Sequence, residues 1–283
     1  MQIPFSEKTI NYYSLDGIRK FMECLNCGTK CQGAYCPTCG QKTTVGRFQM
    51  KEIAVNTVNS LLTSDNKIWR TCVCLLSRPG HMIREYLLGK RVRYYAPVPL
   101  LVFLVAIYAM AAYFFTDALS PFDVVKLDMK PDNTESSSAE MLLSYYQMLL
   151  NNRLYYAIYS VLICIPTYRF AFRKQYLSRP TEAQSALNMA EHFIVLTYQT
   201  CFNMILALLL IPFSYSEDGK TLVAWLCFVM PTIYCFIIYR QMLSISWKKS
   251  ILLNILAVLL SMLLNVTIMV TLYGILYGID NIK

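Results

Sequence analysis

The sequence predicts an α-helical polytopic membrane protein with about five transmembrane helices, preceded by a small cysteine-rich ribbon. Hydrophobic residues make up 56% of the 283 residues and charged residues only 15%, whereas a soluble domain carries about 25% charged residues. The mean hydropathy of +0.40 is also high for a soluble fold, which has to offer water more polar surface. This composition excludes an intrinsically disordered chain.

The N-terminal lead, residues 1–22, lacks the apolar core of a cleavable signal peptide. A zinc ribbon is predicted over residues 23–42, where two Cys-x-x-Cys-Gly turns each aim two sulfurs at one tetrahedral ion. The four predicted ligands of Zn²⁺ are Cys24, Cys27, Cys36 and Cys39. Because so short a segment has no apolar core, metal binding would supply most of its folding free energy. Disulfides are the alternative, and they are disfavoured in a reducing cytosol.

A fifth cysteine, Cys31, lies between the two turns at no useful ligand spacing. We interpret it as a spare thiol. Redox sensing is the alternative, and only Lys30 stands near enough in the sequence to lower its pKa.

Residues 43–96 are predicted to form a basic amphipathic helical connector. Apolar residues recur there with helical periodicity, and basic residues occupy the opposing faces. Helices of this kind lie at membrane interfaces, where each basic residue gains about 1 kcal/mol from anionic lipid. The predicted headgroup-binding residues are Arg78, Arg84, Lys90, Arg91 and Arg93. The alternative is that these residues only fix the membrane topology.

A five-helix transmembrane bundle is predicted over residues 97–279. A span needs about 20 apolar residues to cross roughly 30 Å of hydrocarbon, because lipid offers no partner to an unpaired backbone group. Five segments qualify, and only the second contains a charged residue, Arg153 near one end: 94–116, 150–168, 193–216, 221–239 and 250–279.

The distribution of Lys and Arg predicts the orientation of these spans. Residues 1–96 hold 14 of the 26 basic residues, and the connections at 169–179 and 240–249 hold 4 and 3 more. Because Lys and Arg resist translocation, these parts are predicted to be cytoplasmic. Five spans then place the N-terminus in the cytoplasm and the C-terminus on the opposite side.

Several short motifs accompany this architecture. They are the paired Cys turns ending in Gly40-Gln41, then Arg70-Thr71, Arg78-Pro79-Gly80, Arg84-Glu85-Tyr86, Gly89-Lys90-Arg91, and Tyr94 and Pro97 before an apolar run. Over about residues 24–115 the chain resembles the domain-of-unknown-function 3667 family of bacterial membrane proteins. The resemblance implies a bacterial membrane protein and assigns it no activity. Together with the orientation of the spans, it predicts a multi-pass protein of the bacterial inner membrane with a cytoplasmic N-terminus and a periplasmic C-terminus. A looser likeness links it to lipophilic envelope transport proteins, which also join cytoplasmic zinc ribbons to membrane spans.

Polar residues form two seams inside the predicted spans. His192, Gln199 and Asn203 share one face of the third span, and Asn254, Ser261 and Asn265 repeat the same offsets in the fifth. Such seams can line a path for a polar headgroup or a proton, with His192 able to titrate near neutral pH. The alternative is hydrogen bonding between packed helices, worth about 0.6 kcal/mol each.

The leading hypothesis is that this integral inner-membrane protein handles or transports envelope lipids or amphiphiles, with anionic lipid headgroups as its partners. The alternative is a membrane-anchored adaptor or regulator whose cytoplasmic zinc ribbon docks a protein partner. We expect no enzymatic activity, because the sequence lacks a Ser-His-Asp set, a phosphate loop and an intramembrane carboxylate pair. We expect no nucleic-acid binding, because the basic residues are not interleaved with aromatic residues on the ribbon.

Overall fold

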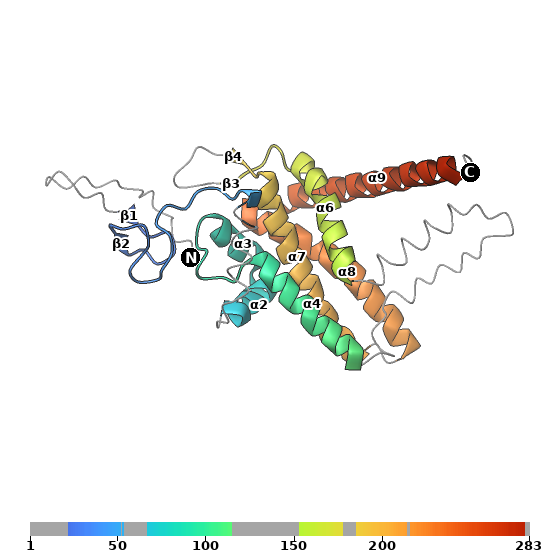
Figure 1. Cartoon of the computed structure of the whole chain (residues 1–283), viewed down its shortest axis with the longest axis horizontal. Coiled ribbons are helices and arrows are strands. Elements are labelled where there is room, and N and C mark those ends of the chain that lie inside the picture. The colour runs from blue at the N-terminus through green and yellow to red at the C-terminus, as the bar shows by residue number, and fades with distance from the viewer. Residues whose placement is uncertain are drawn as a thin grey trace.

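The computed structural model describes residues 22–51, 53, 67–114, 153–177, 185–213 and 216–280. These residues form a mostly helical protein with two short pairs of antiparallel strands (Figure 1). Nearly all of the predicted N-terminal lead lies outside the described residues, as do residues 54–66 of the connector and the connection between the first two predicted spans.

The cysteine-rich part is a compact loop structure without a helix. Strand β1 (Met22–Glu23) pairs with β2 (Lys30–Cys31), and these two strands flank the first Cys turn. A single bridge between Tyr35 and Lys42 flanks the second turn in the same way. The two turns are therefore built alike, each at the closed end of a short antiparallel pair.

The connector forms two short helices, as its periodicity predicts. Helix α2 (Lys67–Ser77) is followed at once by α3 (Pro79–Leu87), which begins at Pro79 because proline suits the first helical turn. Helix α3 packs closely on α8, and a Cβ atom at Gly80 would lie 2.5 Å from the carbonyl oxygen of Ile238. Only glycine permits this approach, so Gly80 allows the connector to pack directly on the backbone of α8.

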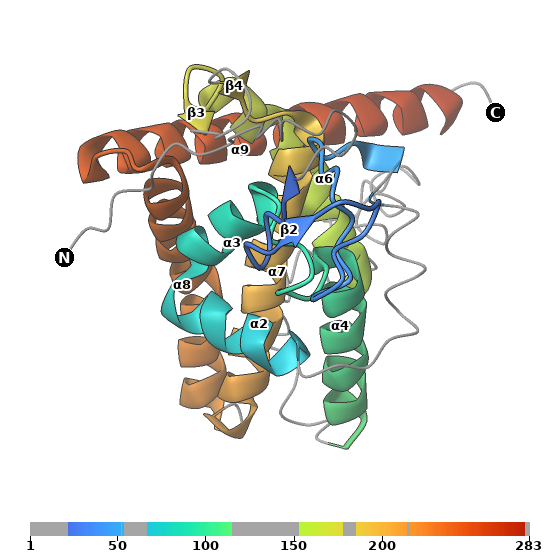
Figure 2. The same cartoon turned by 90° about the vertical axis from the view of Figure 1, so that its left-hand side faces the viewer.

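Five longer helices form that bundle: α4 (Pro97–Phe114), α6 (Arg153–Ala171), α7 (Met189–Leu210), α8 (Glu217–Leu243) and α9 (Trp247–Asp280). Helix α7 is central and packs against α4, α6 and α8, while α2 and α3 lie across α7 and α8 (Figure 2). Between α6 and α7, β3 (Tyr176–Leu177) pairs with β4 (Ser185–Ala186), and the short 3-10 helix η2 (Ile211–Phe213) follows α7.

Three of these helices are long and apolar enough to cross a membrane, in agreement with the third, fourth and fifth predicted spans. Their apolar lengths are Met189–Phe213, Trp225–Leu243 and Trp247–Leu272. The first two predicted spans correspond to shorter apolar helices, Pro97–Ala111 and Ile158–Ala171. These described apolar stretches are shorter than the about 20 residues that a span needs. The described residues therefore support a membrane protein with three candidate spans.

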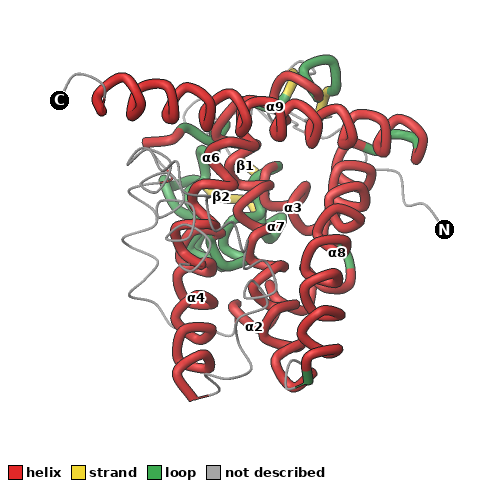
Figure 3. The backbone as a smooth tube through the Cα atoms, turned by 90° about the vertical axis from the view of Figure 1, so that its right-hand side faces the viewer, coloured by secondary structure: helices red, strands yellow, loops and turns green. Residues whose placement is uncertain are grey.

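Helix α9 runs across the other bundle helices instead of alongside them (Figures 2 and 3). It packs against α6 and α8, and only 6% of its apolar span is buried inside the protein. Large apolar side chains are exposed along most of its length, which is typical of a face that meets lipid.

Candidate metal centre and connector

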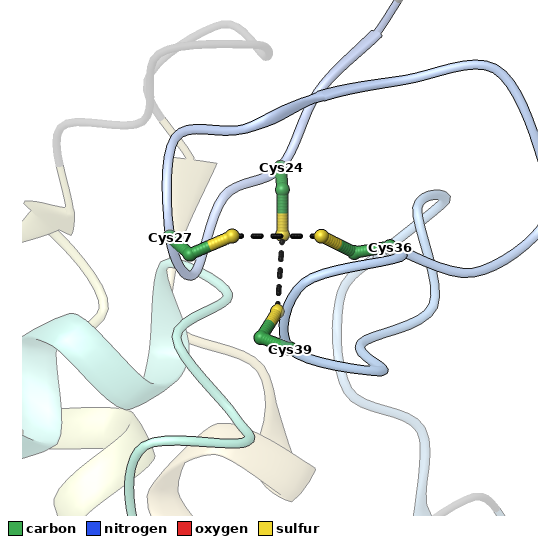
Figure 4. Close-up of side chains that lie close together, drawn as sticks. All are labelled: Cys24, Cys27, Cys36 and Cys39. Carbon is green, nitrogen blue, oxygen red and sulfur yellow. Dashed lines mark hydrogen bonds between the residues drawn. The ribbon is translucent and has the colours of Figure 1, made fainter.

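The four cysteines predicted as zinc ligands come together in one cluster. Their sulfur atoms all lie within 4.8 Å of one another. Cys27 Sγ lies 3.5 Å from Cys36 Sγ, and Cys24 Sγ lies 3.6 Å from Cys39 Sγ (Figure 4). Four sulfurs bound tetrahedrally at about 2.3 Å from a zinc ion are about 3.8 Å apart. The cluster therefore fits one tetrahedral metal ion that accepts four thiolates.

Each half of the cluster is held by the same backbone turn. The N–H of Gly28 donates to the carbonyl oxygen of Cys24 (2.8 Å), and the N–H of Gly40 donates to that of Cys36 (2.9 Å). Both glycines adopt positive φ angles, 77° and 70°, which side chains with a Cβ atom rarely adopt. The glycine after each Cys-x-x-Cys pair is thus required by the turn that aims the two sulfurs.

The protein surroundings change the thiol pKa values in opposite directions. Burial raises the pKa of Cys24 to about 12. At Cys36 the effect of burial is outweighed by the backbone N–H groups of Cys39 and Thr38, which lower the pKa to about 6. A bound divalent cation would deprotonate all four thiols, because the thiolate is the form that coordinates metal.

Cys31 lies outside the four-sulfur cluster, as its spacing predicts. Its thiol is buried and donates to the carbonyl oxygen of Thr29 (3.2 Å). Burial raises the pKa of Cys31 to about 11, and thiols with raised pKa values react slowly. These surroundings favour the spare-thiol interpretation over redox sensing.

The segment that follows the cysteine cluster, residues 41–48, is here called the strap, and its first residue is Gln41. The Gln41 side chain is only 4% exposed and contacts the connection between α3 and α4. Its Nε2 donates to the carbonyl oxygen of Gly89 (2.7 Å), and its Oε1 accepts from the N–H groups of Arg91 (3.1 Å) and Val92 (3.3 Å). One buried amide therefore satisfies three backbone groups of the α3–α4 connection.

Close packing accompanies these hydrogen bonds. Gly89 has a φ of 113°, and a Cβ atom there would lie 2.8 Å from the Leu25 side chain of the cysteine cluster. The Arg91 guanidinium donates to the carbonyl oxygen of Gly46 and lies 3.6 Å from the centre of the Phe48 ring. The cysteine cluster is thus docked on the α3–α4 connection.

The far end of the strap contacts the first turn of α7. Arg47 Nη2 lies 2.9 Å from Glu191 Oε2, and its Nε donates to Oε1 (3.3 Å). Glu191 is fully buried and forms a capping box with Asn188, whose side chain also donates to the carbonyl oxygen of Phe48 (3.0 Å). The Phe48 ring stacks on Tyr86 of α3. The strap therefore joins the cysteine cluster, α3 and α7.

Glu85 forms ion pairs with two of the predicted headgroup-binding residues. Lys90 Nζ lies 3.3 Å and Arg93 Nη1 lies 3.9 Å from its carboxylate, and the Tyr94 hydroxyl donates to it at 2.6 Å. Burial raises the pKa of Glu85. The Tyr94 hydrogen bond and the two positive charges lower the pKa by more than burial raises it, so the net shift is downward.

The other three predicted headgroup-binding residues also have partners within the protein. These pairs are Arg78 with the Cys74 side chain, Arg84 with Ser244 Oγ (2.9 Å), and Arg91 with the carbonyl oxygen of Gly46. All five predicted residues thus contribute to the packing of the connector, whatever else they bind.

Helix α2 has two apolar faces, and the sequence periodicity did not tell them apart. Its inner face holds Thr71, whose Oγ1 accepts from the N–H of Tyr95 (2.9 Å), and Leu75, whose carbonyl oxygen accepts from the Tyr234 hydroxyl (2.7 Å). A second set of apolar residues points away from the bundle and is exposed: Trp69, Val73 and Leu76.

The two predicted polar seams face different helices. In α7, His192 Nδ1 lies 3.1 Å from the Tyr239 hydroxyl, and Gln199 Oε1 accepts from the Cys235 thiol (3.2 Å). Both partners belong to α8. Asn203 lies one turn further along α7, and its Oδ1 is buried without a hydrogen bond to any residue that the structure describes.

In α9, Ser261 Oγ lies 2.7 Å from Thr167 Oγ1 of α6. Asn254 is fully buried, and its Nδ2 donates to the carbonyl oxygen of Ser250 in its own helix. Asn265 follows Ser261 by one turn. The two seams therefore do not share one interface: the first faces α8, and the second contacts α6.

Residues 65–109 match the model of a family described as "Protein of unknown function (DUF3667)". The predicted family resemblance is confirmed over these residues. The matched region comprises α2, α3, the α3–α4 connection and most of α4, so it contains the surface on which the cysteine cluster is docked. Comparison with curated proteins and with solved structures gave no match.

Two site features escaped the sequence analysis. Gln41 belongs to a recognised motif, but its position after Gly40 gives no sign of the backbone groups that it meets 48 residues later. Arg47 is one of many basic residues of the connector, and only the buried Glu191 distinguishes it.

Proposed function

We propose that this protein is an integral protein of the bacterial inner membrane that handles anionic lipids or related amphiphiles at the cytoplasmic surface. In this proposal the cysteine cluster holds a structural Zn²⁺ ion, and the connector meets the lipid headgroups. The observation that carries it is the outer face of α2, where Trp69, Val73 and Leu76 are exposed beside the exposed Arg70.

The anchoring of α2 supports this proposal. Because Thr71 and Leu75 are hydrogen-bonded to Tyr95 and to Tyr234 of α8, the helix cannot rotate to bury its outer face in the bundle. Trp69 is 76% exposed, and tryptophan prefers the boundary between hydrocarbon and headgroups. An amphipathic helix in that position brings its basic residues to the headgroups, where each gains about 1 kcal/mol from anionic lipid.

Headgroup binding is further assigned to the predicted residues of α3 and the α3–α4 connection. Their internal partners leave part of each guanidinium or ammonium group to donate outward, because Arg offers five N–H donors and Lys three. Within the bundle, a polar part of the amphiphile would meet the seam of α7 at Asn203, whose buried Oδ1 has no hydrogen-bond partner among the described residues.

Native mass spectrometry tests this function. The full chain is reconstituted with equal amounts of phosphatidylglycerol and phosphatidylethanolamine, and retained lipid and metal are read from one spectrum. We expect one zinc ion per chain and an enrichment of phosphatidylglycerol that Trp69→Ser combined with Arg70→Gln abolishes. Trp225→Ser, at an exposed tryptophan of α8, is the matched control and should keep the enrichment. Equal retention of both lipids by the wild-type protein would refute lipid handling.

A second candidate is the adaptor whose ribbon docks a cytosolic protein. Tyr35, beside the second Cys turn, favours it, because this aromatic side chain is 65% exposed on the ribbon. Exposed tyrosines are common anchors in protein interfaces. The adaptor predicts that Tyr35→Ser releases a co-purifying protein while metal content and lipid preference stay unchanged, and an unchanged set of co-purifying proteins contradicts it.

A further inference from the structure

The strap connects the cysteine cluster to two parts of the membrane bundle that are far apart in the sequence. Gln41 contacts the α3–α4 connection, and Arg47 and Phe48 contact α7 and α3. These contacts lie near the ends of one eight-residue segment, so the strap links the cysteine cluster to both sites.

We propose that the metal-bound cysteine cluster acts as a latch. Metal binding holds the strap in place, and the strap holds the α3–α4 connection and the first turn of α7. Metal occupancy is thereby communicated to the helices of the bundle. This inference does not depend on lipid handling, because it concerns contacts within the chain.

The first step couples the metal to Gln41. The carbonyl oxygen of Gln41 accepts from the N–H of Cys36 (2.8 Å), so the backbone of Gln41 is part of the second Cys turn. A small four-thiolate site folds only when the metal is bound. When the turn opens, the Gln41 side chain leaves, and the N–H groups of Arg91 and Val92 lose their acceptor.

The second step reaches α7. Glu191 is fully buried, and Arg47 is a cationic partner that reaches it from outside the bundle. A buried carboxylate that loses a cationic partner is destabilised, so the first turn of α7 rearranges or admits water when the strap detaches. Asn188 loses the carbonyl oxygen of Phe48 in the same event.

Hydrogen–deuterium exchange of the purified full chain in detergent tests the latch. The metal-free protein is prepared with excess EDTA and, independently, as the Cys24→Ser/Cys39→Ser variant, and metal content is measured in every sample. We expect exchange about tenfold faster than in the metal-bound protein for residues 88–93, because the N–H groups of Arg91 and Val92 lose their acceptor. We expect the same increase for residues 186–192, because the capping box whose side chains protect the N–H groups of Asn188 and Glu191 rearranges when the strap detaches. Exchange in residues 230–240 of α8 should stay unchanged, which excludes general unfolding.

Variants that keep the metal separate the latch from the ribbon. Gln41→Ala should retain one metal ion and still speed exchange at residues 88–93, whereas Gln32→Ala, at an exposed glutamine of the ribbon, should not. Unchanged exchange at 88–93 in the metal-free protein, or in Gln41→Ala, would overturn the proposal. A failed lipid experiment would leave these results unaffected, because no lipid is added.

Discussion

Replacing Arg47 by Met should destabilise the protein, because Arg47 is paired with a buried carboxylate. Arg47 Nη2 and Nε contact both carboxylate oxygens of Glu191, at 2.9 and 3.3 Å. The Glu191 side chain is completely buried, and that of Arg47 is 28% exposed. Met keeps the apolar stem and removes only the charge, so the variant takes a cationic partner away from a buried carboxylate.

The magnitude follows from this asymmetry. Removing one partner of a fully buried ion pair costs about 3–5 kcal/mol. Because Arg47 is partly solvated and the Asn188 N–H still donates to Glu191 at 2.9 Å, we expect about 2–3 kcal/mol here. Glu191→Gln should cost only about 1 kcal/mol, since Gln serves equally well in a capping box and Arg47 can turn to water.

The double variant Arg47→Met/Glu191→Gln should be about as stable as Glu191→Gln alone, which corresponds to a coupling of about 2 kcal/mol. Thermal unfolding in detergent measures it, with a decrease in Tm of about 5–10 °C for Arg47→Met. Lys174→Met, at an exposed lysine between α6 and β3, is the control and should leave Tm unchanged. Strictly additive effects of the two substitutions would refute the buried ion pair.

Three further substitutions test the site. Cys24→Ser should abolish binding of one metal ion per chain, as native mass spectrometry measures, and full metal content in this variant would contradict a four-thiolate site. Gly89→Ala should lower the free energy of unfolding by about 1–3 kcal/mol because of its positive φ and close contact, whereas Gly46→Ala, in open space, should be neutral. Glu85→Gln should flatten the acid limb of the stability profile: the pKa of Glu85 is lowered in the folded protein, so its contribution is complete above about pH 4.5 and is lost as pH falls through the folded value. Equally steep loss of stability in wild type and Glu85→Gln would contradict this.

The cysteine cluster could be predicted because everything that determines it is local. The residues from Cys24 to Gly40 contain all four sulfurs and the two glycines of the Cys turns with positive φ. Two residues between thiolates fix the geometry of each turn, so spacing alone predicts the arrangement. Three of the five predicted spans agree with candidate spans of the structure. They were predictable for a different reason, since hydrocarbon selects for length and composition rather than for particular partners.

The strap could not be predicted, because its partners are chosen by tertiary packing. Arg47 and Glu191 are 144 residues apart, and no sequence pattern indicates that Arg47 pairs with a buried carboxylate. The position of α2 was hidden for a related reason. Trp69 and Leu75 both fit an apolar helical pattern, and the hydrogen bonds from Tyr95 and Tyr234 to the inner face show which side turns inward.

Helix α9 is longer than a membrane span needs, and its contacts with other helices determine how it lies. Its 34 residues extend about 51 Å, whereas the hydrocarbon is only roughly 30 Å thick. An upright helix of this length would push apolar turns into water, and a strong tilt avoids that cost. Length alone fixes no angle, and the crossing of α9 over the other helices follows from its packing on α6 and α8 (Figure 3). Ser261 contacts Thr167 of α6 there, so this polar residue of the seam acts as a packing contact between helices.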